Sequence, residues 1–338
     1  MLPPNYGYYK EIFTQELYVN GLEVIRTINP EFLIAGPIGT YSNYYGLDQS
    51  QIQKAIDYLN SNGGGTVFLR KAVYVFTETL ILRQDVNISA EVGTIIQGNG
   101  ATNLIYSDAI YNSTIENITF NSCDYPINLF CGNIIIKNCI FNNSIISIKL
   151  NDDNPYSNNL IDSCVFNESI ETSIYITPNI TDTTVKNCKF INADTLGIGI
   201  VSNSSTTIKK CYFKKQSVSI QFAINLILTN STFEDSDKLL QGYGILSPSG
   251  FNYLLINDII VINSGAVNQY LNYAFGEGDY EITIDGIKYL KKPSSGVAFS
   301  WEGGGATNLV YKVSGMNELF DIKCNNVNVH QNSYLRQP

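Results

Sequence analysis

Histidine and arginine are scarce in this sequence. Its 338 residues include one histidine, His330, and four arginines, Arg26, Arg70, Arg83 and Arg336. A Ser-His-Asp triad or a histidine zinc site would have to be built around His330. We interpret His330 as a surface residue and expect neither type of site. The gap between Arg83 and Arg336 also removes arginine as a catalytic group from the middle of the chain.

Charged residues and long apolar runs are also few. Only 15% of the residues are charged, and 30 acidic against 21 basic side chains give a net charge of -9. Such a surface repels phosphate backbones and anionic headgroups, so we expect no nucleic-acid partner. No apolar run reaches the roughly 18 residues of a membrane-spanning helix, and the first residues lack the pattern of a signal peptide. We therefore expect a soluble chain without membrane insertion.

The cysteines number seven, so they cannot all pair within the chain. Their spacing matches neither zinc-binding nor redox motifs. Four of them recur at one position of a repeat: Cys139, Cys164, Cys188 and Cys211. A free cysteine behaves as a small buried apolar residue. We predict a column of reduced cysteines in the core, with no metal and no cofactor.

The sequence is dominated by a repeat with the template aliphatic, any, Asn, Cys, any, Phe. Its aliphatic positions are Ile115, Ile136, Ile161, Val185, Ile208, Leu228 and Ile256. Its last positions are Phe120, Phe141, Phe166, Phe190, Phe213, Phe233 and Val261. The interval between successive members runs from 20 residues (Phe213 to Phe233) to 28 (Phe233 to Val261). A repeat of this length indicates a solenoid with loops of variable length.

Each repeat is rich in Ile, Val, Phe and Tyr and is broken by Asn, Gly and Ser, which is typical of short β-strands. A single repeat cannot bury its own apolar face, but stacked coils can. The sequence therefore predicts an all-β, right-handed, single-stranded parallel β-helix. The Asn position is expected to adopt the left-handed backbone conformation that Asn and Gly tolerate. This position is occupied by Asn117, Asn138, Asn187, Asn230 and Gly286. In three repeats it is occupied by another residue type: Ser163, Lys210 and Asp258.

An amphipathic helix is predicted ahead of the repeat. Asp48 with Gln51 is similar to a capping box, and Ile52, Ala55, Ile56 and Leu59 follow at helical spacing before three glycines. The helix would cover the open edge of the first coil. Residues 48–82 resemble the N-terminal module of the pectate-lyase-like superfamily, and the resemblance extends to about residue 261. It implies the β-helix fold and leaves the function open, because this superfamily includes lyases, hydrolases, phage tailspikes, adhesins and structural proteins.

Three segments are predicted. Residues 1–46 form a tyrosine-rich arm that either docks and forms oligomers or packs on the first coils. Residues 47–290 form the β-helix, and residues 291–338 form irregular last coils and a C-terminal cap. The tailspike resemblance implies a homotrimer.

Two carboxylates are candidate catalytic residues. Asp194 and Asp237 each follow their Phe position by four residues and lie two coils apart, roughly 9.6 Å if coils are about 4.8 Å apart. Inverting glycosidases separate two carboxylates by about 6.5 to 9.5 Å. The run from Asn192 to Ile200 is similar to a polygalacturonase segment, but Thr195 replaces its second aspartate and its Gly-His-Gly and Arg-x-Lys motifs are missing. Solvated turns are therefore the favoured interpretation of both residues.

Glycan binding requires only aromatic faces and hydrogen-bonding groups on a rigid surface. In the strand after each Phe, the alternation predicts that Lys149, Tyr175, Gly199 and Gln221 face outward. The loop of residues 151–156, which contains Tyr156, would form one wall of a groove. Its Asp152 and Asp153 offer too few oxygens for calcium.

The favoured hypothesis is a tailspike-like adhesin, exposed on a virion or cell surface, that binds polysaccharide or glycoprotein glycans of a host. The alternative is a polysaccharide hydrolase or lyase with a non-standard carboxylate site, and a third possibility is a structural protein without a ligand.

Overall fold

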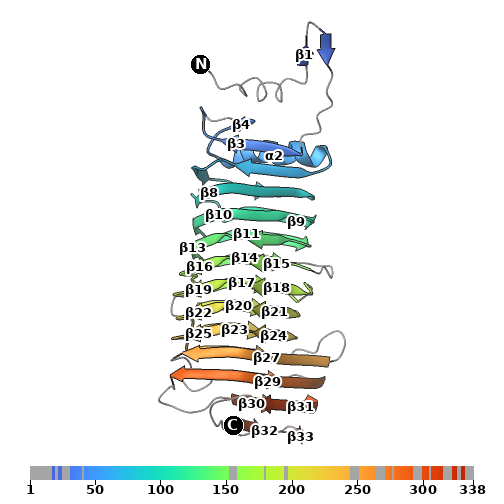
Figure 1. Cartoon of the computed structure of the whole chain (residues 1–338), viewed down its shortest axis with the longest axis vertical. Coiled ribbons are helices and arrows are strands. Elements are labelled where there is room, and N and C mark those ends of the chain that lie inside the picture. Colours follow the sequence, from blue (N-terminus) through green and yellow to red (C-terminus); the bar gives the residue numbers. More distant parts are fainter. Residues whose placement is uncertain are drawn as a thin grey trace.

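The computed structural model of the 338-residue chain is a tall stack of β-coils with a helix near its N-terminal end (Figure 1). It describes residues 17–19, 22–24, 31–39, 42–151, 158–178, 180–193, 197–243, 251–262, 271–275, 278–291, 299–303, 306–314, 322–325 and 329–331. None of the helices among these residues is long and apolar enough to cross a membrane.

The strands form three sheets. Sheet A is the antiparallel pair β1 (Leu17–Val19) and β2 (Leu22–Val24). Sheet B contains β3 (Phe32–Gly36), β4 (Tyr44–Tyr45), β5 (Gly65–Leu69), β6 (Val73–Phe76), β8 (Val86–Gly98), β10 (Thr114–Cys123), β12 (Ile135–Lys137), β13 (Ile140–Ser144), β15 (Leu160–Asp162), β16 (Val165–Asn167), β18 (Thr183–Lys186), β19 (Lys189–Ile191), β21 (Thr206–Lys209), β22 (Tyr212–Lys214), β24 (Leu226–Thr229), β25 (Thr232–Glu234), β27 (Phe251–Ile262), β29 (Gly278–Lys291), β31 (Ala306–Ser314) and β33 (Val329–Gln331). Sheet C contains β7 (Leu80–Ile81), β9 (Asn103–Tyr111), β11 (Tyr125–Gly132), β14 (Ile146–Asn151), β17 (Thr172–Ile176), β20 (Ile198–Ser202), β23 (Val218–Phe222), β26 (Lys238–Tyr243), β28 (Leu271–Phe275), β30 (Phe299–Gly303) and β32 (Ile322–Asn325).

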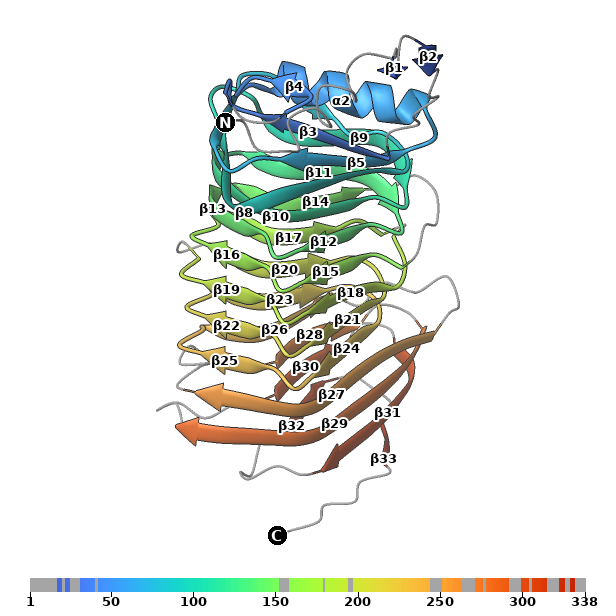
Figure 2. The same ribbon diagram turned by 45° about the horizontal axis from the view of Figure 1, so that its top comes forward.

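Each central coil contributes two short strands to sheet B and one strand to sheet C, and every strand pairs in parallel with its equivalent in the next coil (Figure 2). The register aligns the repeat, so that Phe141 pairs with Phe166 and Phe166 with Phe190. The predicted parallel β-helix is confirmed. It arises because each coil leaves an apolar face that only the neighbouring coils can bury.

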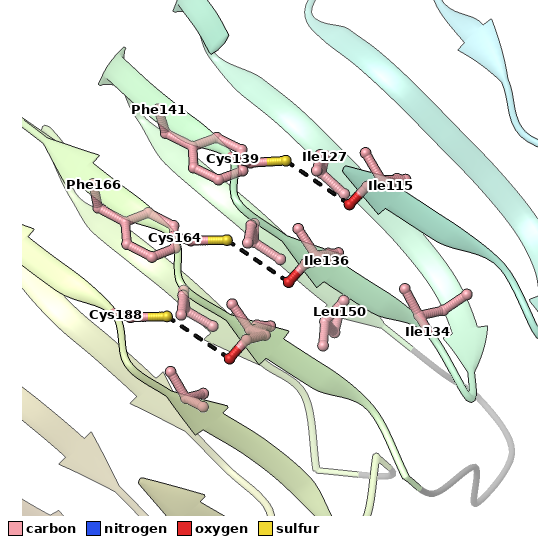
Figure 3. Close-up of a cluster of buried hydrophobic side chains, with 14 of the residues drawn as sticks. Ile115, Ile127, Ile134, Ile136, Cys139, Phe141, Leu150, Cys164, Phe166 and Cys188 are labelled. Atoms are coloured by element: carbon pink, nitrogen blue, oxygen red, sulfur yellow. Dashed lines mark hydrogen bonds between the residues drawn. The ribbon is translucent and has the colours of Figure 1, made fainter. Parts of the chain in front are cut away.

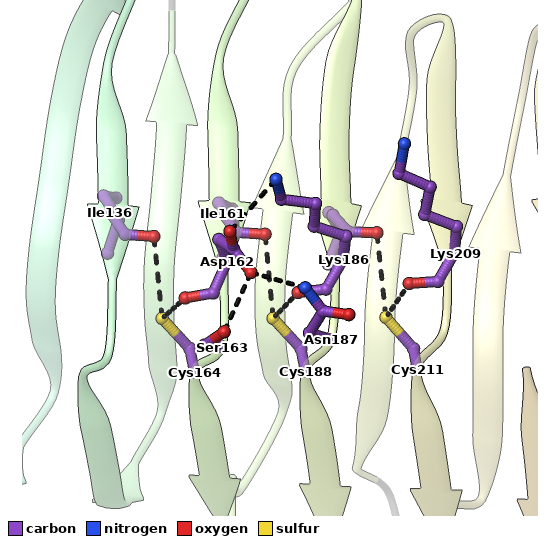
Figure 4. A network of polar contacts seen from close by, with 11 residues as sticks. Ile136, Ile161, Asp162, Ser163, Cys164, Lys186, Asn187, Cys188, Lys209 and Cys211 are labelled. Atoms are coloured by element: carbon purple, nitrogen blue, oxygen red, sulfur yellow. Dashed lines mark hydrogen bonds and ion pairs between the residues drawn. The ribbon is translucent and has the colours of Figure 1, made fainter.

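The repeated Phe and Cys side chains fill the core. The rings from Phe120 to Phe233 stack with centroids 4.6–5.1 Å apart and are buried. The cysteines between residues 123 and 211 are free and buried, as predicted for the column. The four thiols of the column donate to backbone carbonyls: Cys164 Sγ, for example, lies 3.7 Å from Ile136 O and 3.4 Å from Asp162 O (Figures 3 and 4). These weak bonds satisfy the thiols inside an apolar interior.

Left-handed backbone conformations mark the corners. The predicted Asn position has a positive φ in every copy from Asn117 to Gly286, and its three departures, Ser163, Lys210 and Asp258, share it. Two further corners have the same property. One contains Asn112, Asn133, Asn158 and Asp182, and the other contains Ser122, Asn143, Glu168, Asn192, Lys215 and Asp235. The backbone thus requires this conformation even where the side chain does not favour it.

Helix α2 (Gln49–Ser61) lies across the first coils (Figure 2). Asp48 is its N-cap, accepting a hydrogen bond from the backbone N–H of Ser50. The apolar side of the helix is fully buried; it comprises Ile52, Ala55, Ile56 and Leu59. The sequence prediction of a capping helix is therefore confirmed.

Parallel pairing begins at β3, which aligns with β5, and continues to the pair of β30 with β32. Most of residues 1–46 lies outside the described residues. The boundaries at residues 46 and 290, and the roles given to the two end segments, stay predictions.

One orientation is wrong: Gly199 does not face outward. A Cβ placed on it would lie 3.1 Å from the ring of Phe213, so the position faces the core. The equivalent residues, Ser147, Ser173 and Ser219, are also buried. Two successive residues, such as Ser147 and Ile148, face inward where the chain enters sheet C, which shifts the alternation by one. The Phe stack leaves room there only for small side chains.

Candidate functional site

Sheet C carries one row of side chains on its outer surface, one from each coil. The register aligns Tyr106, Asn128, Lys149, Tyr175, Val201, Gln221 and Gln241. We call these residues the outer row. Successive members are about 4.8 Å apart because they belong to neighbouring parallel strands. Their neighbours along the chain, such as Ile148 and Ile174, are fully buried. Because side chains alternate along a strand, the side chains of the outer row therefore face away from the core.

Lys149 and Tyr175 are adjacent members of the outer row and are half-buried. The side-chain amide of Asn203 lies 3.4 Å from the hydroxyl oxygen of Tyr175, within reach of a hydrogen bond. This contact draws the phenol toward the next coil, beside Val201, whose exposed fraction is 7%. Tyr175 thus lies between Lys149 of the preceding coil and Asn203 of the next coil.

Gln221 lies two coils beyond Tyr175, with Val201 between them, and pairs in register with Gln241. Its half-buried side chain extends the outer row by a second amide. Three of the four predicted binding residues, Lys149, Tyr175 and Gln221, thus share one face. The fourth, Tyr156, lies outside the described residues. Their role in binding stays a prediction.

An aromatic and acidic cluster at the N-terminal end of the outer row was not predicted. The rings of Tyr106 and Phe130 meet edge to face, with centroids 6.1 Å apart. The hydroxyl of Tyr106 donates to the carboxylate of Asp108, and this bond, together with burial, raises the pKa of Tyr106. Asp108 lies two residues after Tyr106, with the buried Ser107 between them, so both side chains face outward. The alternation of the strand could have indicated these two positions, whereas the approach of Phe130 depends on the pairing of β9 with β11.

Hydrogen bonds between asparagine side chains join three successive coils between the Tyr106 cluster and Lys149. Asn128 Nδ2 donates to Asn103 Oδ1 at 2.9 Å, and Asn151 Nδ2 donates to Asn128 Oδ1 at 2.6 Å. Each amide is therefore held in place by the next. The amide of Asn128, which lies in the outer row between Tyr106 and Lys149, is consequently oriented by a hydrogen bond on each side.

The structure describes only one member of the predicted catalytic pair, Asp237. Asp237 is exposed at the corner before β26, where its backbone N–H donates to Gln216 O at 2.9 Å. Asp194 lies outside the described residues, so their separation stays a prediction, and the same holds for Asp152 and Asp153. Among the described residues, no group of three or more His, Cys, Asp or Glu side chains could hold a metal ion.

The arrangement suits recognition of a flat, hydroxyl-rich ligand. Two aromatic positions, Tyr106 with Phe130 and Tyr175, offer ring faces or edges on which the apolar side of a sugar can rest. The amides of Asn128 and Gln221 and the ammonium group of Lys149 can bond hydroxyl oxygens. The row lies on a sheet, so these groups keep their mutual distances without a ligand.

Two overlapping stretches, residues 58–213 and 103–260, match the family described as "Right handed beta helix region". Together they cover more than half of the chain. The chain belongs to this right-handed β-helix family. This confirms the predicted handedness and the superfamily resemblance. No curated protein matches the chain at a significant level.

Solved structures with the same fold include surface proteins of bacteria and phages. The Streptococcus pneumoniae surface protein and adhesin PfbA has a TM-score of 0.52 at 14% identity, covering 84% of this chain and 95% of its own. The tailspike protein of E. coli bacteriophage HK620, in complex with a pentasaccharide, has a TM-score of 0.56 at 11% identity, covering 96% and 71%. The tailspike of Acinetobacter baumannii bacteriophage Fri1, a capsular polysaccharide depolymerase, has a TM-score of 0.50 at 13% identity, covering 96% and 67%. At these identities the likeness concerns the fold.

Proposed function

We propose that this chain is a glycan-binding protein, exposed on a virion or cell surface, that binds polysaccharide or glycoprotein glycans of a host through the outer row of sheet C. The observation that carries the proposal is the register that aligns Tyr106, Asn128, Lys149, Tyr175 and Gln221 on one face. A sugar chain along this row would cross successive coils and meet a new side chain about every 4.8 Å.

Preorganisation supports this proposal. The Asn128 amide is bonded to Asn103 and Asn151, and the Tyr175 hydroxyl is bonded to Asn203. Side chains that are already ordered lose little conformational entropy when a ligand binds. The same residues on mobile loops would bind more weakly.

The surface location and the adhesin role rest on likeness of fold to PfbA and to the two tailspikes, together with the low charge and high Tyr and Asn content of the chain. A phage or cell-surface protein with this fold would present sheet C to its environment. A homotrimer, formed with the arm of residues 1–46, is part of the same proposal.

The test is a glycan-array screen followed by titration of the best ligand against Tyr175→Ala. Removal of the ring should weaken binding by about 1 kcal/mol or more, which corresponds to at least about fivefold. Tyr45→Ala is the matched control, because Tyr45 is 49% exposed on sheet B and should leave the affinity unchanged. Equal losses in both variants, or no array ligand for the wild type, would refute the proposal.

A reducing-end assay on the same ligand distinguishes a protein that only binds the glycan from one that also cleaves it. The proposal expects no release of reducing ends by the wild type. Cleavage that is lost in Asp194→Asn, while binding persists, would instead favour the hydrolase that the two carboxylates Asp194 and Asp237 suggest.

A further inference from the structure

Six lysines gather on two consecutive coils of sheet B. They are Lys186, Lys189, Lys209, Lys210, Lys214 and Lys215. The sequence from Thr195 to Phe233 contains no Asp or Glu, although the whole chain has a net charge of -9. We call these six residues the lysine band. A positive cluster of this size in an acidic chain produces a strong local field of opposite sign.

The lysine band lies on the outer surface of sheet B. Lys186 pairs in register with Lys209, and Lys189 with Tyr212. Their sequence neighbours Val185, Cys188 and Phe190 point inward and are buried. Lys189 and Lys209 are exposed, as are the corner residues Lys210 and Lys215.

Two of the six lysines have ion pairs with the neighbouring coils. Lys186 Nζ lies 3.1 Å from Asp162 Oδ2, a contact visible in Figure 4, and Lys214 Nζ lies 2.7 Å from Glu234 Oε1. Among the described residues, the other four, Lys189, Lys209, Lys210 and Lys215, form no ion pair. Four exposed ammonium groups therefore stay available to an anionic ligand.

Acidic side chains lie on the coils before and after the lysine band. The preceding coil contributes Asp162 and Glu168, and the following coils contribute Glu234, Asp235 and Asp258. The positive surface is therefore two coils wide, roughly 10 Å, but it follows each coil along two strands and around the corner at Lys210 between them. An anionic chain fits only if it lies parallel to the strands.

Uncharged groups complete the surface. Tyr212 lies in register between Lys189 and Thr232, and its hydroxyl donates to Glu234. Burial and the charge of Glu234 raise the pKa of Tyr212, so the phenol keeps its proton at neutral pH. Exposed Asn187 lies at the corner between Lys186 and Lys189. Hydroxyl and amide groups between cations are suited to a ligand that has hydroxyls between its charges.

We propose that the lysine band binds a single acidic polysaccharide chain, bearing carboxylates on its sugars, that lies along the strands of sheet B. This is a second surface, separate from the outer row of sheet C. A nucleic acid duplex fits less well, because it has one charge per about 1.7 Å of helix axis and its second strand would face the acidic coils beside the lysine band. A uronate chain differs from a single-stranded nucleic acid in supplying several hydroxyls per charge for Tyr212 and Asn187.

The test measures binding of alginate oligosaccharides, uncharged dextran oligosaccharides of equal length, and single-stranded DNA to the full chain. The wild type should bind alginate at low salt, bind it progressively more weakly as salt is added, and bind dextran at least tenfold more weakly. The double variant Lys189→Gln with Lys209→Gln should bind alginate about tenfold more weakly. Thermal unfolding would verify that both proteins are folded.

The matched control is Lys54→Gln with Lys71→Gln, which removes two exposed lysines near α2 and changes the net charge equally. Its alginate affinity should stay within about twofold of the wild type. Absence of alginate binding, an equal loss in the control, or DNA binding as tight as alginate binding would overturn the proposal. Tyr175→Ala should leave alginate binding unchanged, so failure of this proposal and failure of the proposed function are distinguishable.

Discussion

At the scale of single residues, the corners of the coils depend on a backbone conformation that most side chains disfavour. Asn117, Asn138, Asn187 and Asn230 adopt it at low cost, whereas Lys210 adopts it with a φ of 55° at the equivalent position. A left-handed conformation costs a residue with an ordinary side chain roughly 1–2 kcal/mol, and Asn less. Lys210 is therefore a strained position in an otherwise regular column.

Replacing Lys210 with Asn should stabilise the protein. The substitution should raise the free energy of unfolding by about 0.5 to 1 kcal/mol, because Asn tolerates the left-handed region. Urea denaturation would measure it. Lys209→Asn is the control, because Lys209 lies within the neighbouring strand β21, where Asn is disfavoured. A loss of stability in Lys210→Asn equal to that in the control would contradict the explanation.

One corner was predicted from the sequence and the other two were not. The corner of Asn112, Asn133 and Asn158 also repeats Asn, but it lies outside the Cys and Phe template that was used to align the coils. At the third corner Glu168 and Lys215 are equivalent to Asn143, so no shared residue type reveals that position. Gly199 was misplaced for a similar reason: strict alternation does not account for the two inward residues at the start of each sheet C strand.

At the scale of elements, the helix that closes the stack also completes an edge of sheet C. Among the described strands, β7 is the edge strand of this sheet and pairs only with β9. Gln53 of α2 replaces that strand: the backbone N–H of Ile81 donates to Gln53 Oε1 at 2.7 Å, and Gln53 Nε2 donates to Ile81 O at 3.1 Å. One side-chain amide thus satisfies both backbone groups at an open edge.

Gln53→Ala should destabilise the protein by about 1 to 3 kcal/mol, because it leaves the backbone groups of Ile81 without partners. Gln51→Ala is the matched control in the same helix, since the side-chain amide of Gln51 bonds only to Ser50 among the hydrogen bonds described. Thermal unfolding of both variants would provide the comparison. Equal melting temperatures would show that the edge does not need Gln53.

The site was partly predictable at this scale. Alternation in the strands placed Lys149, Tyr175 and Gln221 on the outer face, because each follows a buried aliphatic residue in a regular strand. The cluster of Tyr106, Asp108 and Phe130 was missed. It depends on the pairing between β9 and β11, which brings Phe130 beside Tyr106 and which the repeated Cys and Phe template does not specify.

At the scale of the whole molecule, the β-helix presents two faces with different chemistry. The outer row of sheet C has aromatic and amide groups, and sheet B has the lysine band with acidic coils on both sides. Because the coils are fixed by parallel ladders and a stacked core, each row is a rigid series of groups. One chain can therefore offer two binding surfaces that act independently.

The central claim is that glycans bind along the outer row of sheet C, and hydroxyl-radical footprinting tests it most directly. The best ligand from the glycan array should reduce oxidation of Tyr106, Phe130 and Tyr175 when it saturates the protein. Exposed Tyr45 on sheet B should be oxidised equally with and without it. The account predicts protection confined to the outer row and the adjacent Phe130; unchanged oxidation of these three aromatic residues in the saturated complex would contradict it.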